Sequence, residues 1–298
     1  MHDCVVVGAG PAGLTAAIYL GRFRRDVAVI DAGDSRAARI PLSRNHPGFP
    51  DGVRGRTLLA RMRRQAERYG ASISRGRVED LRRADEGFRL TVEGGETAAR
   101  AVLLATGVVD VEPEIPGVDE AVAQGLIRIC PICDGYETIG ERVGVIGRDG
   151  HAAAEARFML TYTPQVTLIH AGAAEDLPDA ERRALAKAGV EVVEAPIASV
   201  ALDRKRISAV CFGPDETRRF DSLYSALGVR PRTRLAQAAG ARLDRDGRLL
   251  VGEHQETSVP GLYAAGDVVR GLNQISTAEA EAAIAATHIH NTLREAGL

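Results

Sequence analysis

The chain contains two copies of one pattern, 139 positions apart. In each copy a short apolar run enters a glycine turn and is followed by a helix-favouring stretch and a second apolar run. Residues 5–8 align with 144–147, and residues 27–31 align with 166–170, without a gap. A strand, a crossover helix and a second parallel strand form a βαβ unit. The repetition therefore predicts an α/β protein with two Rossmann-like units.

The first copy carries the complete dinucleotide-binding fingerprint. Residues 8–13 read Gly-Ala-Gly-Pro-Ala-Gly, directly after an apolar strand and before a helical pattern. In this fingerprint Gly8 allows the tight turn, Gly10 lets the backbone approach a pyrophosphate, and Gly13 lets the helix meet the strand. Asp31 ends the next strand, where it can accept hydrogen bonds from adenosine ribose hydroxyls. A purely structural glycine turn is the weaker interpretation.

The second copy keeps the pattern but changes the residues that would bind a nucleotide. Asp149 replaces the second glycine and puts a negative charge where a diphosphate would lie, which costs on the order of several kcal/mol. His170 ends the second strand, and residues 170–172 lack the arginines that pair with a ribose 2′-phosphate. We therefore expect a degenerate NADPH site. A shifted turn, with Gly150 in one glycine role, is the alternative that would preserve some binding.

The four cysteines fall into two kinds. Cys4 and Cys211 lie in apolar runs and are expected to be small core residues. Cys130 and Cys133 are separated by two residues, a spacing that suits redox cycling. A zinc site needs four ligands, and no second Cys-x-x-Cys or paired histidine lies nearby, so we expect no metal. Asp134 is a candidate proton donor or acceptor for a thiolate, or alternatively a cap of the following turn.

Composition excludes several classes of function. A net charge of −2 argues against nucleic-acid binding, and Arg61, Arg63 and Arg64 are expected on a solvated helix face. No apolar run is long enough to span a membrane, and residues 1–3 lead directly into a strand without a signal-peptide pattern. These features predict a cytoplasmic protein with no membrane contact.

Four motifs in order make the chain resemble the low-molecular-weight thioredoxin reductases and their relatives. Residues 8–13 are followed by Leu-Ala-Thr-Gly at 104–107, Cys-Pro-Ile-Cys-Asp-Gly at 130–135 and Gly-Leu-Tyr-Ala-Ala-Gly-Asp at 261–267. The resemblance spans nearly the whole chain and implies two Rossmann-like, three-layer ββα domains, the second inserted into the first.

The expected domain limits also follow from this resemblance. It implies a discontinuous FAD-binding domain, residues 1–112 plus 236–298. The inserted pyridine-nucleotide-like domain, residues 113–235, would carry the Cys-x-x-Cys pair. Residues 112–117 and 229–232 are rich in proline or basic residues, lack apolar periodicity, and would form the links.

The resemblance implies FAD as the cofactor. In the family, Gly266 and Asp267 hold the ribityl and pyrophosphate region, and a helix expected to begin near Thr277 points its N-terminus toward the flavin. This helix would carry acidic residues in its first turn, and Gln274 lies just ahead of it. The expected FAD-binding residues are Gly8, Gly10, Pro11, Ala12, Gly13, Asp31, Thr106, Gly107, Gly266, Asp267 and Gln274.

The resemblance also implies roles for the redox residues. Cys133 would be the thiol nearest the flavin, Cys130 would exchange with substrate, and Asp134 would handle protons. The family's glycine-rich loop and His-Arg-Arg run are replaced here at 147–150 and 170–172, so NADPH is not the expected reductant.

The predicted function is therefore that of an FAD-dependent thiol/disulfide oxidoreductase cycling a Cys130–Cys133 disulfide. Its substrate would be a thioredoxin-like protein or a small dithiol or disulfide, and an electron-donor protein would reduce it. A dithiol oxidase using oxygen, an NADPH-dependent thioredoxin reductase and a non-catalytic flavin-bearing sensor are the alternatives. Relatives of this kind imply a homodimer.

Overall fold

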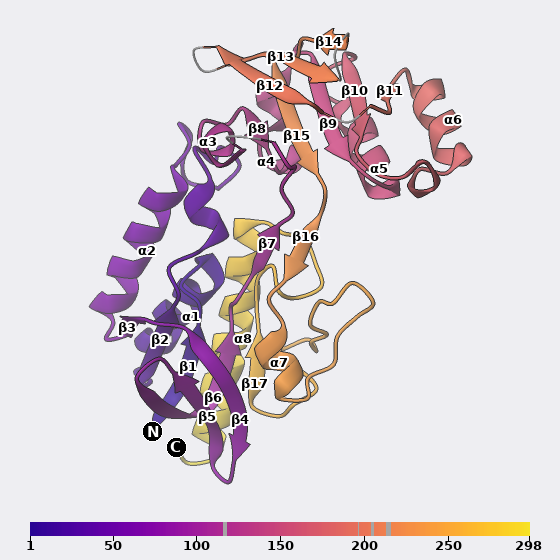
Figure 1. The fold of residues 1–298 in the computed structure, drawn as a ribbon. Helices are drawn as coiled ribbons and strands as arrows, with labels where there is room; N and C mark the ends of the chain where they lie inside the picture. The colour runs from indigo at the N-terminus through magenta and orange to yellow at the C-terminus, as the bar shows by residue number, and fades with distance from the viewer. Residues whose placement is uncertain (116–117, 196, 204–205, 213–215) are drawn as a thin grey trace. The chain divides into compact units, whose positions relative to one another are not determined.

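The computed structural model describes residues 1–115, 118–195, 197–203, 206–212 and 216–298. It divides into two compact units (Figure 1). Unit 1 comprises residues 1–42, 53–109 and 230–298, and unit 2 comprises residues 43–52 and 110–229. The strands where the chain passes between units, β7 (Val108–Asp110) and β16 (Val229–Pro231), pair with each other. Residues 116 and 117, in the first predicted link, lie outside the described residues.

Unit 1 is built on a seven-stranded mixed sheet with the order β3-β2-β1-β6-β5-β4, in which β17 also pairs with β6. Its strands are β1 (His2–Val7), β2 (Val27–Asp31), β3 (Ser72–Arg75), β4 (Val78–Ala84), β5 (Gly87–Val92), β6 (Gly95–Leu104) and β17 (Leu262–Ala264). Strands β1, β2, β3, β17 and the end of β6 run parallel, whereas β4 and β5 form an antiparallel ribbon with the start of β6.

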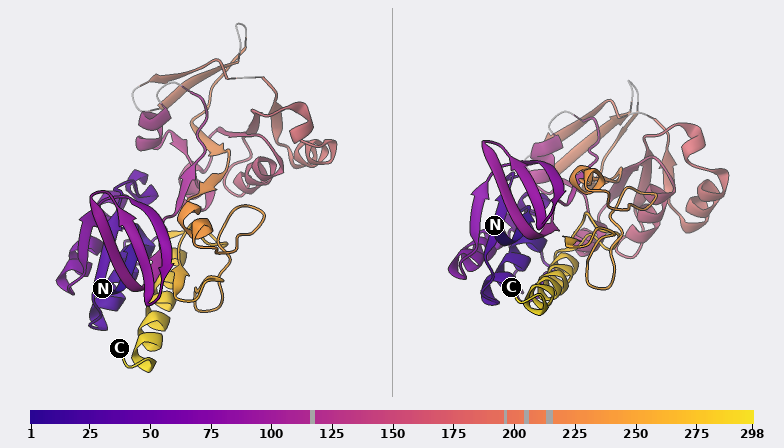
Figure 2. Two further views of the ribbon diagram at one scale, coloured as in Figure 1. Left: turned by 60° about the horizontal axis from the view of Figure 1, so that its bottom comes forward. Right: turned by 90° about the horizontal axis from the view of Figure 1, so that it is seen from below.

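The alternation of side chains along β1 explains the three layers of unit 1. Val5 and Val7 join one core cluster with Phe88 and Leu90 of the antiparallel ribbon. Val6, which points to the other face, is also fully buried. Figures 1 and 2 show helices of unit 1 alongside its parallel strands. These helices are α1 (Pro11–Arg22), α2 (Gly55–Arg68), α7 (Arg234–Ala238) and α8 (Ile275–Glu295), with the short 3-10 helix η1 (Arg36–Arg39).

Helix α8 presents a stripe of small residues, and α1 and α8 lie against each other. Its buried residues are mostly alanines, which let two helix backbones approach closely. The helix begins at Ile275, two residues before the start predicted near Thr277, and the prediction of acidic residues in its first turn is wrong. Gln274 is still extended, and the helix begins immediately after it, so the first turn contains no acidic residue. Glu279 and Glu281 fall later in the helix instead.

Unit 2 contains a five-stranded parallel sheet with the order β11-β10-β9-β15-β8. Its strands are β8 (Ile127–Arg128), β9 (Val143–Gly147), β10 (Val166–His170), β11 (Glu191–Val193) and β15 (Ser222–Ala226). A second, antiparallel sheet consists of β12 (Ser199–Asp203), β13 (Arg206–Phe212) and β14 (Glu216–Arg218). The helices are α3 (Val118–Ala123), α4 (Pro131–Asp134), α5 (Gly150–Met159) and α6 (Asp179–Ala188), with the 3-10 helices η2 (Gly135–Thr138) and η3 (Ala174–Asp176).

The repeat predicted from the sequence is confirmed in three dimensions. In unit 1 the segment β1-α1-β2 forms a parallel βαβ element, with Cys4 opposite Val27. In unit 2 the segment β9-α5-β10 forms the equivalent element, with Val143 opposite Val166. The α/β class with two Rossmann-like units is therefore correct.

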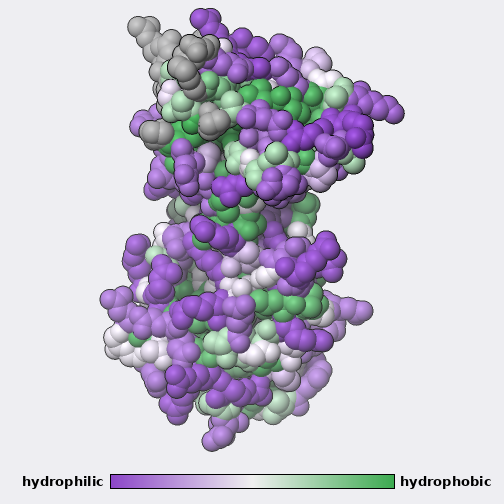
Figure 3. Space-filling model, turned by 45° about the vertical axis from the view of Figure 1, so that its right-hand side comes forward, coloured by the Kyte–Doolittle hydropathy of each residue, from purple (hydrophilic) through white to green (hydrophobic). Residues whose placement is uncertain are grey.

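The surface carries polar residues over much of both units. Figure 3 shows hydrophilic residues over much of the visible face of each unit, with smaller hydrophobic areas between them. Within the described ranges, no helix is both long and apolar enough to cross a membrane. Of the two cysteines expected in the core, Cys4 is fully buried, but Cys211 is only half-buried, on β13 beside Thr217 of β14.

Candidate redox and nucleotide sites

A disulfide joins Cys130 and Cys133, whose Cα atoms are 5.3 Å apart. Cys130 precedes the short helix α4, and Pro131, with its fixed φ, occupies the first helical turn. The Cys133 N–H donates to the Cys130 carbonyl at 2.9 Å. One helical turn therefore folds the Cys-x-x-Cys segment back on itself and brings the two side chains together.

Asp134, the next residue, is held by side chains from two strands. Tyr224 of β15 donates its hydroxyl hydrogen to Oδ1 at 2.8 Å, and Arg128 of β8 lies 3.2 Å from Oδ2. Burial raises the pKa of Asp134 above its ordinary value, while the charge of Arg128 and the hydrogen bond from Tyr224 oppose that rise. The carboxylate does not cap η2, so the alternative capping role predicted for it is wrong.

A loop from the N-terminal third of the chain contributes to this region of unit 2. Arg44 lies 3.6 Å from Glu137 of η2, and the Asn45 amide donates to the main-chain oxygen of Ile132 at 3.4 Å. Ile132, between the two cysteines, is about half exposed. The pattern of the Cys-x-x-Cys motif alone gave no indication of these contacts.

Three motifs of unit 1 converge where the fingerprint predicted a dinucleotide. A side chain on Gly8, whose φ is +106°, would collide with the Ala105 carbonyl, next to Thr106. A side chain on Gly13 would collide with the Gly8 carbonyl. A Cβ on Gly266 would lie 3.1 Å from the Cβ of Ala12. The turn after β1, the turn after β6 and the motif after β17 therefore meet at one end of the sheet.

The N-terminus of α1 fits a diphosphate. Gly10 is extended, carries no capping side chain, and is followed by Pro11, which has no N–H to satisfy. The first backbone N–H groups of a helix lack intrahelical acceptors and favour an anion. An uncapped, side-chain-free turn therefore matches the pyrophosphate of FAD.

Several of the other predicted cofactor residues form hydrogen bonds or ion pairs with neighbouring protein groups. Asp31 accepts from the Ala9 N–H at 3.2 Å and lies 3.3 Å from Arg63. Thr106 donates its hydroxyl hydrogen to the Arg232 carbonyl at 2.8 Å. Gly107 has a φ of +67°, which favours glycine, and Gln274 forms the N-cap of α8. The ion pair of Arg63 differs from the purely solvated face predicted for it.

Two further side chains at this end of unit 1 were not predicted from the sequence. Arg36 lies 3.2 Å from the Asp267 carboxylate. Glu281 of α8 accepts from the Gly266 N–H at 2.7 Å. Burial raises the pKa of Glu281, and the hydrogen bond from Gly266 opposes that rise. Neither residue belongs to a recognisable motif, so only their proximity to Gly266 and Asp267 could have identified them.

The equivalent turn in unit 2 is closed by its own side chain. Asp149 is the N-cap of α5, and its Oδ1 accepts from the backbone N–H groups of His151 at 2.9 Å and Ala152 at 3.3 Å. The carboxylate thus bonds the same backbone groups that hold a phosphate in a dinucleotide fold. Gly150 is the first residue of α5 and has open space where a side chain would lie. No close approach of the backbone therefore requires a glycine here, which argues against the alternative of a shifted turn.

The end of β10 is also occupied by protein groups. His170 is buried, and its Nε2 lies 2.6 Å from the Arg148 carbonyl oxygen. Its Nδ1 lies 3.7 Å from Glu194, which forms a 2.5 Å ion pair with Arg182. No three histidine, cysteine or acidic side chains are grouped to hold a metal within the described parts of the chain.

Comparison with known proteins gives consistent matches over the full length. The family model for pyridine nucleotide-disulphide oxidoreductases matches residues 2–282. A bifunctional thioredoxin reductase/thioredoxin from Mycobacterium leprae is 32% identical over 99% of this chain, which spans 66% of that relative's length.

Two solved structures are similar over both chains. The crystal structure of HlmI has a TM-score of 0.91 and 32% identity, covering 99% of this chain and 93% of that one. Thioredoxin reductase from Streptococcus pyogenes has a TM-score of 0.92 and 26% identity, covering 99% of each chain.

Proposed function

The chain belongs to the pyridine nucleotide-disulphide oxidoreductase family, as a thioredoxin reductase-like, FAD-dependent disulfide oxidoreductase, and we propose that its redox cycle does not use NADPH. The observation that carries the proposal is the Asp149 carboxylate bonded to the N-terminus of α5. The proposed reductant is an electron-donor protein, and the proposed product is a reduced thioredoxin-like protein or small dithiol. By the same resemblance, we propose a cytoplasmic homodimer.

The residues of unit 1 account for FAD binding in this proposal. The uncapped turn at Gly10 and Gly13 would hold the diphosphate, Asp31 the adenosine ribose, and Asp267 the ribityl region. Bound FAD supplies a two-electron redox partner for the Cys130–Cys133 disulfide.

The exclusion of NADPH follows from charge and from hydrogen bonding. A pyrophosphate at the start of α5 would have to displace Asp149 from two backbone N–H groups or remain within a few ångströms of its negative charge. Either costs on the order of several kcal/mol in a partly desolvated turn. A 2′-phosphate would also meet Glu194, whose carboxylate already pairs with Arg182. Both phosphate positions of NADPH are therefore unfavourable.

The thiol half of the reaction needs only residues that are present. In the reduced protein, the Cys130 thiolate attacks one sulfur of an external disulfide and forms a mixed disulfide. Cys133 then attacks the Cys130 sulfur, re-forms the Cys130–Cys133 bond and releases the substrate as a dithiol. Two electrons leave the cysteine pair, and Asp134 accepts a proton as Cys133 becomes a thiolate.

An anaerobic reduction experiment tests the proposal. The purified flavoprotein is mixed separately with NADPH, NADH and dithiothreitol, and the visible flavin absorbance is followed. We expect dithiothreitol to bleach the flavin and both nicotinamides to leave it oxidised. Bleaching by NADPH as fast as by dithiothreitol contradicts the proposal. Rapid oxygen consumption with dithiothreitol in air supports the dithiol oxidase instead.

A cysteine variant tests the electron path. Cys133→Ser removes the thiol assigned to face the flavin and should abolish bleaching by dithiothreitol. Cys211→Ser is the matched control, because Cys211 is a free, half-buried cysteine on β13. If Cys133→Ser bleaches at the parent rate, the assignment of the flavin-proximal thiol is wrong.

A further inference from the structure

The two partners of Asp134 come from adjacent positions on neighbouring strands. Tyr224 of β15 and Arg128 of β8 are register partners in the parallel sheet of unit 2. Arg128 lies on β8, the edge strand of that sheet, and Tyr224 lies on β15, the strand next to it. The pairing places a hydroxyl and a guanidinium side by side, and each reaches a different oxygen of Asp134. Arg128 also donates to the main-chain oxygen of Asp134 at 3.3 Å.

The surroundings of Asp134 make this arrangement electrostatically significant. Tyr224 is buried, and Arg128 is largely buried, with a side-chain exposure of 17%. The other charged groups that act on the cluster are Glu137 of η2, paired with Arg44, and Glu141, which acts on Arg128. Glu141 accepts a hydrogen bond from Ser222 at 2.8 Å. Within the described residues, Arg128 is therefore the cation that pairs with the Asp134 carboxylate.

Resting on the proposed function, we propose that Arg128 and Tyr224 are positioning residues that hold the Asp134 carboxyl next to the redox pair and control its proton affinity. Neither residue touches the reacting sulfurs in this role. Tyr224 fixes the direction of one oxygen, and Arg128 offsets the cost of burying the charge. Together they set the pH at which Asp134 changes between proton donor and proton acceptor.

The proton step can be written for reduction of the pair by an external dithiol. A thiolate of the reductant attacks the Cys130 sulfur, the Cys130–Cys133 bond breaks, and Cys133 leaves as a thiolate. Asp134 donates its proton to that thiolate and regains one from solvent. The second thiol of the reductant then displaces Cys130 and forms the reductant's own disulfide. Two electrons and two protons pass from the reductant to the cysteine pair.

Removing Arg128 should raise the pH at which Asp134 loses its proton and so change the pH dependence of this step. Burial favours the neutral acid, and Arg128 opposes that preference, so Arg128→Met should leave Asp134 protonated to higher pH. We expect the Asp134-dependent inflection in the rate of pair reduction to move up by about one pH unit or more. Tyr224→Phe should move it in the same direction by less, because it removes one hydrogen bond to the carboxylate and no full charge. Arg128→Lys should restore most of the wild-type profile.

The test measures the cysteine pair itself rather than turnover. Holoprotein is mixed anaerobically with dithiothreitol at a series of pH values, quenched with an alkylating reagent, and scored by mass for free Cys130 and Cys133. Asp134→Asn gives the profile without the acid and so accounts for the ionisation of dithiothreitol. The matched control is Arg142→Met, which removes an arginine of the same unit that pairs with Asp221. This control should leave the inflection unchanged.

The double variant Arg128→Met/Asp134→Asn decides between positioning and general structural damage. Its profile should match that of Asp134→Asn, because Arg128 acts through Asp134. An inflection that stays in place in both Arg128→Met and Tyr224→Phe, or a wild-type profile without an Asp134-dependent inflection, overturns the inference. If the wild-type pair is not reduced at any pH, the proposed function fails and the inference with it. If Arg128→Met does not fold, Arg128→Gln and Tyr224→Phe provide the same comparison.

Discussion

At the scale of single residues, the two βαβ elements differ most at the N-cap of the crossover helix. Gly10 leaves the start of α1 uncapped, whereas Asp149 caps the start of α5 with its own carboxylate. The same helix end therefore attracts an external anion in unit 1 and is already neutralised in unit 2. In the proposed function, the loss of a nucleotide site and the gain of a helix cap are two effects of one side chain.

This dual effect predicts a stability loss when Asp149 is replaced. Asp149→Ala removes two hydrogen bonds to α5 and should lower the free energy of unfolding of unit 2 by about 1 kcal/mol. Asp149→Asn keeps an acceptor oxygen and should lose only a fraction of that. Urea unfolding, followed by a probe in unit 2, measures both.

Asp179→Ala is the control for Asp149→Ala. Asp179 is an acidic residue in the first turn of α6, whose N-cap residue, Pro178, forms no side-chain hydrogen bond to the helix. Replacing it removes a favourable interaction with the helix dipole but no cap hydrogen bond. Asp179→Ala should therefore lower the free energy of unfolding by less than Asp149→Ala does. Equal losses in the two variants would show that the cap hydrogen bonds of Asp149 contribute nothing measurable.

At the scale of elements, the contact between β1 and α1 depends on a glycine in the helix. A Cβ on Gly13 would collide with the Gly8 carbonyl and lie 3.2 Å from a methyl of Val6. Gly13→Ala should therefore push α1 away from the turn, at a cost of about 1–3 kcal/mol, and weaken FAD binding about tenfold or more. The measurement is the FAD content per protein chain after gel filtration in dilute buffer.

Gly150→Ala is the matched control at the start of the equivalent helix α5. Its Cβ would meet open space, so FAD content should be unchanged, and the helix should gain up to about 1 kcal/mol from the better propensity of alanine. Retention of FAD by Gly13→Ala at the parent level would contradict the role assigned to this packing.

The elements divide into those that the sequence predicts and those that it does not. β1, α1, β2 and their repeats in unit 2 were predictable, because glycine turns and apolar runs encode them locally. The start of α8 was predicted two residues late, near Thr277, because no strong N-cap residue marks Ile275. The contacts of Asp134 with Arg128 and Tyr224 were also missed, since they depend on the pairing of β8 with β15, which lie far apart in the sequence.

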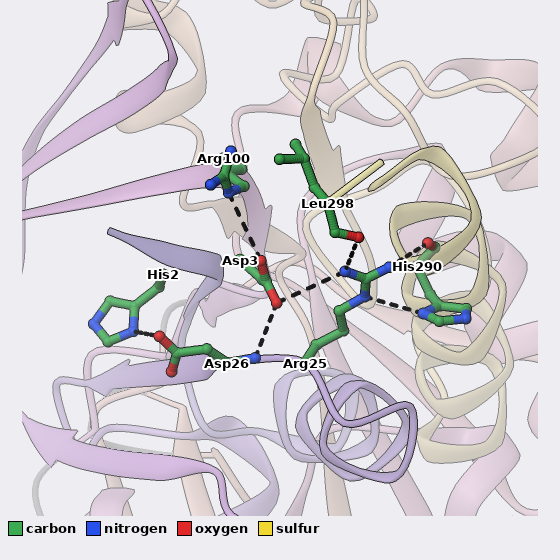
Figure 4. A network of polar contacts seen from close by, with 7 residues as sticks. All are labelled: His2, Asp3, Arg25, Asp26, Arg100, His290 and Leu298. Atoms are coloured by element: carbon green, nitrogen blue, oxygen red, sulfur yellow. Dashed lines mark hydrogen bonds and ion pairs between the residues drawn. The ribbon is translucent and has the colours of Figure 1, made fainter. Parts of the chain in front are cut away.

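Helix α8 is tied at its C-terminal end to the first crossover of unit 1 (Figure 4). Arg25 donates from Nε to the His290 Nδ1 at 3.0 Å and from Nη1 to the Leu298 carbonyl at 2.8 Å. Asp3 lies 3.9 Å from the same guanidinium. Because Nδ1 accepts a hydrogen bond from the Arg25 Nε–H, His290 must be unprotonated at that nitrogen for this contact to form.

This contact predicts a pH-dependent stability of unit 1. Desolvation and the charges of Arg25 and Arg294 lower the pKa of His290 below its ordinary value. The unfolded chain then takes up the proton first as the pH falls below about 6.5, so His290 makes stability decrease with falling pH. His290→Asn should reduce the slope of unfolding free energy against pH between 7 and 5.5, as measured by urea titration.

His151 provides a control of opposite sign. Its hydrogen bond with Glu155 raises its pKa, so its contribution is present at low pH and is lost as the pH rises through the raised value. His151 lies in unit 2, so His151→Gln should change the slope of the unfolding free energy of unit 2 against pH, in the sense opposite to the change that His290→Asn makes in unit 1. If both variants change the slope in the same direction, the environment assigned to His290 is incorrect.

At the scale of the whole molecule, each unit has its own hydrophobic core. One cluster joins β1, β5 and β6 of unit 1 to its C-terminal segment, including Leu249 and Val268. Two others cover the faces of the unit 2 sheet, around Leu223 on one side and Leu168 on the other. The inserted arrangement was predicted by resemblance, and the functional division at residues 112 and 236 remains a prediction. Neither limit corresponds to a local sequence signal as clear as the glycine turns.

Separate cores predict that removing FAD affects the two units differently. FAD in the proposed cradle stabilises only the fold of unit 1, by about 4 kcal/mol when free FAD is a thousandfold above its dissociation constant. Stripping the cofactor should therefore increase amide hydrogen exchange in β1, α1 and β17, which form or support the cradle. Strands β9, β10 and β15 should keep their protection, because their core contains no cradle residue. Readdition of FAD should restore exchange in unit 1 to its starting level, which controls for irreversible damage. Equal deprotection of both sheets on stripping would show that the two units unfold together despite their separate cores.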